Sequence, residues 1–250
     1  MSDSRTIRLD LEYDGADFVG WQVQREGRSV QGELGRCLST FLQEEVVPVA
    51  AGRTDAGTHA LGQVAHFRTE SAHPPDRMIR ALNSLLPDDI AVTAASEVSA
   101  EFHARYSALS KRYRYRIETT KGALERRFVW TLYRSLDCDA MIEASLALRG
   151  VHSFRAFCNS DPEPDSYKCD ILDTSWTRQG SQISFEIVAN RFLRHMARII
   201  VGTLVDVGEG RLTGAAFAEL LRDGRSERSA AGATAPAQGL CLLRVHYPDD

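Results

Sequence analysis

A glycine-punctuated segment, AGRTDAGTHA at residues 51–60, follows a run of β-branched and apolar residues. Gly52 and Gly57 bracket Arg53 and Asp55, and glycines at these places permit a tight turn whose backbone a large ligand can approach. A carboxylate beside an arginine in such a turn is a candidate nucleophile or general base. A second interpretation stays open, in which the aspartate side chain bonds its own backbone in an Asx-turn.

Basic and aromatic residues alternate between residues 102 and 116, with Arg105 at the start of this stretch. Side chains two apart share a face of a strand, so Arg112 and Arg114 are expected on one face and Tyr113 on the other. Such a strand suits RNA, because arginine contacts phosphates while tyrosine stacks on a base. The alternative is a solvated strand whose tyrosines lie in the core.

A third basic segment spans residues 190–198 and is expected to open a helix. Arg191, Arg194 and Arg198 recur three and four residues apart, which places them on one helical face. Cations at a helix N-terminus oppose the macrodipole unless an anion compensates them. Arg198 paired with a carboxylate would keep that acid ionised. An exposed basic helix face is the other interpretation.

Metal and nucleotide cofactors have little support. His59 and His66 match no standard ligand spacing, and Cys158 and Cys169 lack a second pair of soft ligands nearby. Motifs for mononucleotide and dinucleotide binding are absent. We therefore expect no metal and no nucleotide cofactor, although a metal-assisted hydrolase built on Asp55, His59 and His66 remains an alternative to test with EDTA.

The net charge of −4 hides a local basic excess. Residues 103–134 carry nine basic and two acidic side chains, whereas residues 1–100 carry nine basic and fifteen acidic ones. An acidic protein with one basic face still binds polyanions through that face. The overall charge therefore does not exclude a nucleic-acid partner.

The elements that would position these residues follow from hydrophobic periodicity. Strands are expected at residues 6–13, 46–51, 62–69, 90–97, 172–179, 182–189 and 240–247, and residues 102–119 are expected to be mainly extended with a break near residue 110. Helices are expected at residues 29–42, 76–86, 141–148, 194–207 and 214–221. This order predicts an α+β protein with antiparallel sheets covered by helices on one face. We place two halves at residues 1–107 and 108–250.

The compartment is expected to be the cytoplasm. No apolar run approaches the roughly 18–20 residues that cross a bilayer, and the first residues lack the apolar region of a signal peptide. Five scattered cysteines favour reduced thiols over a disulfide framework.

Taken in order, these segments resemble the tRNA pseudouridine synthase A family over nearly the whole chain. The resemblance rests on EYDG at residues 12–15 and GWQ at 20–22, GRTDAG at 52–57, GQ at 62–63, FHAR at 102–105, KRYRY at 111–115, SFR at 153–155, FL at 192–193, HM at 195–196, Arg198 and Gly202. Thr58 and Ala197 depart from the valines usual in the family, and the loop at residues 161–169 matches poorly.

The resemblance implies the isomerisation of uridine to pseudouridine in the tRNA anticodon stem–loop, at uridines 38, 39 and 40. The bond from N1 to C1′ breaks and a bond from C5 to C1′ forms, with no redox change and no cofactor. The implied fold has two RRM-like α/β halves that share a central antiparallel sheet, with the active cleft between them. The implied assembly is a homodimer with tRNA across both subunits.

The resemblance also implies roles for single residues. Asp55 is the essential group, which attacks the base or the sugar or removes a sugar proton. Tyr113 stacks on the flipped uracil, Arg198 pairs with Asp55, and Arg53 fills the space left by the extruded nucleotide. The remaining candidates for tRNA contact are His59, Arg105, Arg112 and Arg114. A non-catalytic RNA-binding protein with the same fold is the alternative function.

Overall fold

The chain folds into two compact units in a computed structural model that describes residues 4–159, 164, 166–222 and 224–248. The first unit contains the described residues up to Leu109 together with those from Cys241 onward, and the second contains Ser110–Leu240. The last strand therefore belongs to the first unit. The expected division into residues 1–107 and 108–250 places this strand in the second half instead.

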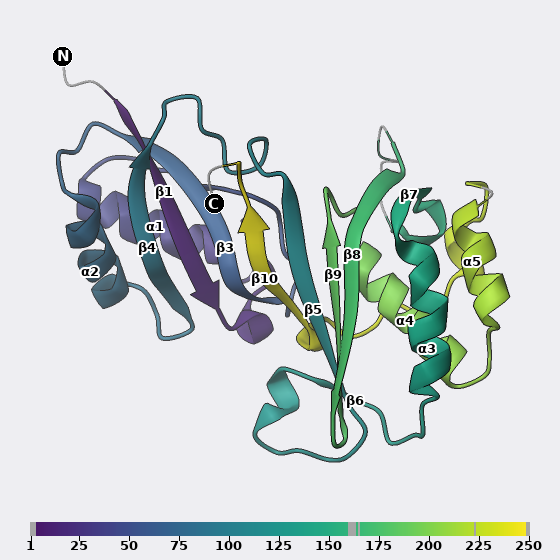
Figure 1. The fold of residues 1–250 in the computed structure, drawn as a ribbon. Coiled ribbons are helices and arrows are strands. Elements are labelled where there is room, and N and C mark those ends of the chain that lie inside the picture. The colour runs from purple at the N-terminus through teal and green to yellow at the C-terminus, as the bar shows by residue number, and fades with distance from the viewer. Residues whose placement is uncertain (1–3, 160–163, 165, 223, 249–250) are drawn as a thin grey trace. The chain divides into compact units, whose positions relative to one another are not determined.

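An open sheet with two helices on one face forms the first unit (Figure 1). Strand β1 lies between β4 and β3 and is antiparallel to both, while β3 also pairs with the short β2 and, in parallel, with β10. The elements are β1 (Arg5–Tyr13), α1 (Val30–Leu42), β2 (Val49–Ala50), β3 (His59–Thr69), α2 (Pro75–Leu85), β4 (Ile90–Val98) and β10 (Leu240–His246).

Alternating burial explains how this unit forms. Ile7, Leu9 and Leu11 of β1 are fully buried, and so are Leu34 and Leu38, which recur at helical spacing on α1. The N-cap of α1 is Ser29, whose Oγ accepts a hydrogen bond from the Gly32 N–H at 3.2 Å. The expected helix at residues 29–42 is confirmed.

The second unit combines an antiparallel sheet with three helices (Figure 1). Strand β9 lies between β5 and β8, β7 pairs with β8 at the edge, and β6 adds two residues in parallel to β5. The elements are β5 (Ser110–Glu118), β6 (Trp130–Thr131), α3 (Cys138–Ser145), β7 (Gly150–Ser153), β8 (Lys168–Gln179), β9 (Gln182–Ala189), α4 (Met196–Gly208) and α5 (Gly214–Arg222).

Each unit therefore mixes helices with a mostly antiparallel sheet, and the α+β prediction is confirmed. The hairpin of β8 and β9 turns at Gly180, which has a φ of +61°. Within the described part of the chain, no helix has both the length and the apolar character needed to cross a membrane.

Three elements begin two or more residues later than expected. The strand at residues 46–51 is reduced to Val49–Ala50. Residues 102–109 are not extended, because the ring Nδ1 of His103 accepts hydrogen bonds from the N–H groups of Arg105 and Tyr106 and closes a turn. The helix expected from residue 194 begins at Met196, because His195 has a φ of +61°.

Candidate active site

The aspartate loop connects β2 to β3 in the first unit. Asp55 forms an isolated β-bridge with Gly20, and its carbonyl oxygen accepts a hydrogen bond from the Thr58 N–H at 3.1 Å. Gly57, with a φ of +77°, supplies the turn expected from the glycine spacing. Asp55 is half-buried and Arg53 is exposed, so the loop presents both side chains at or near the protein surface.

The segment around Gly20 packs directly on the aspartate loop. The Trp21 N–H donates to the Thr54 carbonyl at 3.1 Å, and the Gly57 N–H donates to the Phe18 carbonyl at 3.3 Å. A Cβ atom on Gly20 would lie 2.7 Å from the Thr54 carbonyl oxygen, and Gly20 has a φ of +110°. Both the close approach and the dihedral angle require glycine here.

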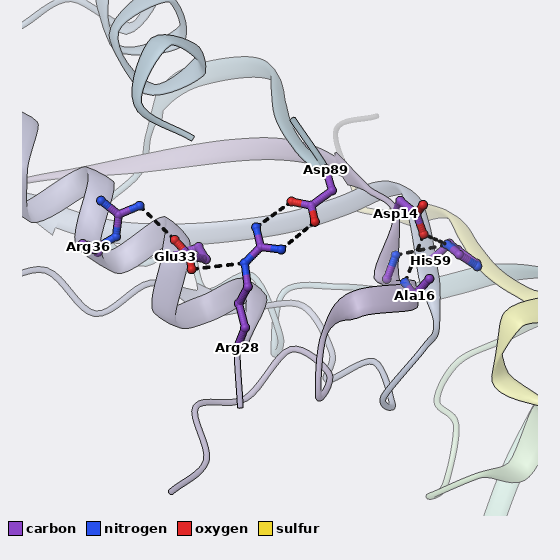
Figure 2. A network of polar contacts seen from close by, with 8 residues as sticks. Asp14, Ala16, Arg28, Glu33, Arg36, His59 and Asp89 are labelled. Atoms are coloured by element: carbon purple, nitrogen blue, oxygen red, sulfur yellow. Dashed lines mark hydrogen bonds and ion pairs between the residues drawn. The ribbon is translucent and has the colours of Figure 1, made fainter. Parts of the chain in front are cut away.

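His59 contacts the turn at residues 14–17, which packs against the aspartate loop. Its side chain is 5% exposed, and its Nδ1 lies 3.1 Å from the Gly15 nitrogen and 3.0 Å from Oδ1 of Asp14 (Figure 2). A Cβ atom on Gly15 would lie 2.0 Å from the Thr58 carbonyl oxygen, so the turn at residues 14–17 sits against the loop. The structure thus buries His59, which follows Asp55 in the chain, inside the first unit.

The segment that leads into α1 is held by ion pairs (Figure 2). The Arg28 guanidinium donates to both carboxylate oxygens of Asp89, at 2.7 and 2.8 Å, and to Glu33 at 3.2 Å. Arg36 donates to the other oxygen of Glu33, and this bond and Arg28 lower the pKa of the Glu33 carboxyl. These ion pairs therefore fix the end of the connection that leads into α1.

The second unit holds the remaining candidates, except for Arg105, which is exposed on the first unit. On β5, Tyr113 and Tyr115 are buried, whereas Arg112 and Arg114 are half-buried on the opposite face. The alternation expected from the sequence is therefore correct. The ring of Tyr113 packs edge-on against Phe192, with 4.9 Å between ring centroids.

Arg198 lies in the first turn of α4 and is fixed by a neighbouring loop. Its Nε donates to the Ala235 carbonyl at 2.7 Å, and the Ala235 N–H donates back to the Arg198 carbonyl at 3.1 Å. Arg191 and Arg194 precede the helix, so the expected helical face of three arginines is wrong. The left-handed conformation of His195 separates them from Arg198.

The predicted site residues thus form two groups. Asp55, Arg53, His59 and Arg105 belong to the first unit, and Tyr113, Arg112, Arg114 and Arg198 to the second. The pairing of Asp55 with Arg198 and the cleft between the halves stay predictions. A cavity of about 520 Å³ on the first unit is lined by Val47, His66 and Phe102 among others, but by none of the residues that the family resemblance implies for the site.

Metal ligands do not gather in the described residues, where no group of three or more His, Cys, Asp or Glu side chains could hold an ion. Of the five cysteines, Cys37, Cys158 and Cys169 are buried. Burial raises the pKa of the Cys169 thiol to about 11.

Sequence reasoning missed a buried polar network beneath the loop, formed by Tyr13, Thr54 and Gln63. Its signal was a glutamine, Gln63, between Gly62 and Val64 in the middle of a strand. Polar residues at such places are buried only with hydrogen-bond partners. Residues 161–163 and 165 of the poorly matching loop lie outside the described residues.

Comparison with known proteins assigns the class. A family model described as tRNA pseudouridine synthase matches residues 11–107 and 144–248. The chain belongs to this family, whose members isomerise uridine to pseudouridine in tRNA. The family that the sequence motifs resemble is thereby confirmed.

Relatives named tRNA pseudouridine synthase A resemble the chain over nearly its full length. The protein of Moorella thermoacetica is 45% identical over 245 residues, which cover 96% of this chain and 99% of the relative. That of Chlorobium luteolum is 45% identical over 248 residues, covering 98% and 97%. That of Halalkalibacterium halodurans is 43% identical over 239 residues, covering 94% and 90%.

Proposed function

We propose that this enzyme isomerises uridines 38, 39 and 40 in the anticodon stem–loop of tRNA, with Asp55 as the essential catalytic group. This proposal is carried by the placement of Asp55 on a short loop that the segment at residues 18–21 holds by main-chain bonds. Catalytic groups on such supported loops stay within reach of the productive geometry. Relatives of the same length named tRNA pseudouridine synthase A support the substrate class.

The reaction needs one group that assists the breaking of the glycosidic bond and a second group that holds the extruded base. We assign the first role to Asp55, acting on the base or the sugar or as a base. The buried ring of Tyr113 is proposed to stack on the flipped uracil and to assist removal of the C5 proton. Arg198 is proposed to keep Asp55 ionised, and Arg53 to occupy the space that the nucleotide vacates.

Contacts with the phosphate backbone are assigned to exposed Arg105 and to half-buried Arg112 and Arg114. Arg105 is exposed, and its guanidinium lies 5.6 Å from the ring centroid of Tyr106, which is 76% exposed. Arg112 and Arg114 line the outer face of β5. For buried His59 we propose an indirect role through the turn at Asp14 and Gly15.

The assembly is proposed to be a cytoplasmic homodimer whose two subunits share one tRNA. Light scattering of the purified protein would show a particle of twice the mass of the chain. A monomer at the concentrations of the activity assay would refute this part of the proposal.

The activity is tested with tRNA that carries tritium at C5 of uridine, with no added metal or nucleotide. We expect wild-type protein to release tritium and Asp55→Asn to release none while still binding tRNA. Asp88→Asn, a change at an exposed aspartate of the same unit, serves as the matched control and should keep full activity. Transcripts with uridine at only one of positions 38, 39 and 40 identify the modified sites.

A non-catalytic RNA-binding protein would bind the same tRNA and release no tritium. Activity that disappears with EDTA would favour the metal-assisted alternative on Asp55, His59 and His66.

A further inference from the structure

Three motifs distant in sequence meet beneath the aspartate loop. Tyr13 ends β1, Thr54 directly precedes Asp55, and Gln63 lies in β3; they are 4%, 6% and 0% exposed. The Tyr13 hydroxyl lies 2.8 Å from Oγ1 of Thr54 and 3.2 Å from Nε2 of Gln63. The same amide nitrogen donates to the Gly52 carbonyl at 2.9 Å.

A register shift between Leu11 and Tyr13 accompanies this arrangement. Gln63 is paired with Leu11 across the β1–β3 ladder, whereas Tyr13 is paired with Ala60. Irregularities of this kind re-aim side chains and recur next to active sites. Here the shift lets the end of β1 and the middle of β3 both contact the loop between β2 and β3.

The directions of the hydrogen bonds follow from the donors available. The Gln63 amide nitrogen can only donate, so the Tyr13 oxygen accepts from it and keeps its own proton for Oγ1 of Thr54. The amide oxygen of Gln63 accepts from the Val64 N–H at 3.3 Å. Burial raises the pKa of Tyr13 to about 12, so the phenol stays protonated at neutral pH and acts as a donor.

The loop is therefore held on two sides. Main-chain bonds from Trp21 and the bridge to Gly20 fix Thr54 and Asp55 from one side. The Tyr13–Gln63 pair fixes the Thr54 side chain and the Gly52 carbonyl from the other. Thr54 carries both kinds of contact and is the residue covalently joined to Asp55.

We propose that Tyr13 and Gln63 are positioning residues that hold the Asp55 carboxylate in its reactive place through Thr54 and Gly52. This proposal rests on the proposed role of Asp55. It assigns a purpose to the Glu-Tyr-Asp-Gly and Gly-Gln motifs, neither of which contributes a reacting group.

The test compares variants that remove a single hydroxyl. Tyr13→Phe and Thr54→Val each delete one end of the 2.8 Å bond. Misplacing a reacting group by about 1 Å costs on the order of 100-fold in rate, so we expect kcat for tritium release to fall by about 10- to 100-fold. KM for tRNA should stay within about twofold, because neither side chain is exposed to RNA.

Two controls separate positioning from general stability. Thr54→Ser keeps the hydroxyl and should restore most of kcat. Thr58→Val removes a buried hydroxyl of the same loop that has no hydrogen-bond partner among the described residues, and should leave kcat unchanged. Thermal unfolding of every variant sets an assay temperature at which all are folded.

Coupling between the two ends provides the decisive comparison. If Tyr13 acts through Thr54, the double variant Tyr13→Phe/Thr54→Val loses no more activity than the worse single variant. Folded Tyr13→Phe with wild-type kcat, or losses that multiply in the double variant, would overturn the proposal. A wild-type protein that releases no tritium would instead refute the proposed function.

Discussion

Single side chains in this enzyme are fixed by partners that the chain supplies from distant positions. Arg198 is an example, since its Nε is held by the Ala235 carbonyl while the residue lies in the first turn of α4. A lysine could carry the charge but has no equivalent of the planar, fixed donor. At position 198 the structure therefore uses the fixed geometry of the guanidinium as well as its charge.

His66 gives the first unit a pH-dependent stability. Burial lowers the pKa of its ring, and the nearby His103, 4.6 Å away between ring centroids, lowers it further. The His66 ring therefore binds a proton less readily in the folded protein than in the unfolded chain, where histidines have a pKa of about 6.5. Stability from neutral His66 is present above that pH and is lost as the pH falls through 6.5 towards the lower folded value.

We expect the free energy of unfolding in urea to decrease between pH 7.5 and pH 5.5, and to decrease less in His66→Asn. Asparagine keeps an acceptor for the Ala104 N–H, which Nδ1 of His66 binds at 3.2 Å. Equal pH slopes for the two proteins would show that His66 does not carry the effect.

At the scale of elements, periodicity predicted most of the fold. The arginine and tyrosine faces of β5, the β8–β9 hairpin and the capped helix α1 all follow from local side-chain patterns. The errors occur where a side chain or an unusual dihedral angle overrides propensity. His103 closes a turn with its own ring, and His195 adopts φ of +61° directly before α4.

The candidate site was predictable only in part for the same reason. Asp55 and its glycines are visible as a short motif, but the support from Tyr13 and Gln63 depends on a strand register that no local pattern specifies. Burial of His59 likewise depends on the turn at Gly15, which lies far away in the sequence.

Helix α4 depends on close contact with the small-residue loop that follows α5. A Cβ atom on Gly202 would lie 1.8 Å from the Ala233 carbonyl oxygen, and the Gly232 N–H donates to Oγ1 of Thr203 at 3.0 Å. We expect Gly202→Ala to reduce the free energy of unfolding by about 1–3 kcal/mol through overpacking.

The same substitution should also lower activity, because the loop that it displaces carries the Ala235 carbonyl that holds Arg198. Gly122→Ala is the matched control, since a Cβ atom there would meet nothing within 4 Å. Urea denaturation of both variants checks the prediction, and equal midpoints would contradict it.

At the scale of the whole molecule, the basic segment at residues 103–134 is less positive than its residue count suggests. Arg112 pairs with Glu186, Arg116 with Glu125, and Arg134 with Glu209, each at 3.0 Å. Glu186 and Glu209 come from outside the segment. Fewer of its cations are therefore available to displace counterions from RNA.

We expect tRNA affinity to fall with salt even though the protein carries a net charge of −4. The logarithm of the binding constant should decrease with the logarithm of salt concentration, with a slope of about −2 to −4, which corresponds to roughly three to five phosphate contacts. Filter binding of tRNA to the inactive Asp55→Asn variant between 50 and 300 mM KCl measures the slope. An affinity independent of salt would contradict the prediction.

The return of β10 to the first unit determines when, during synthesis on the ribosome, that unit can complete its sheet. Cys241 and Leu242 pair with His59 and Ala60, and the Tyr247 hydroxyl donates to the Ala104 carbonyl at 2.6 Å. The ribosome must therefore synthesise all of Ser110–Leu240 before the first unit receives its last strand. At about 5–20 residues per second this delay lasts roughly 7–26 seconds, during which the second unit has time to fold while the first waits with an open sheet edge.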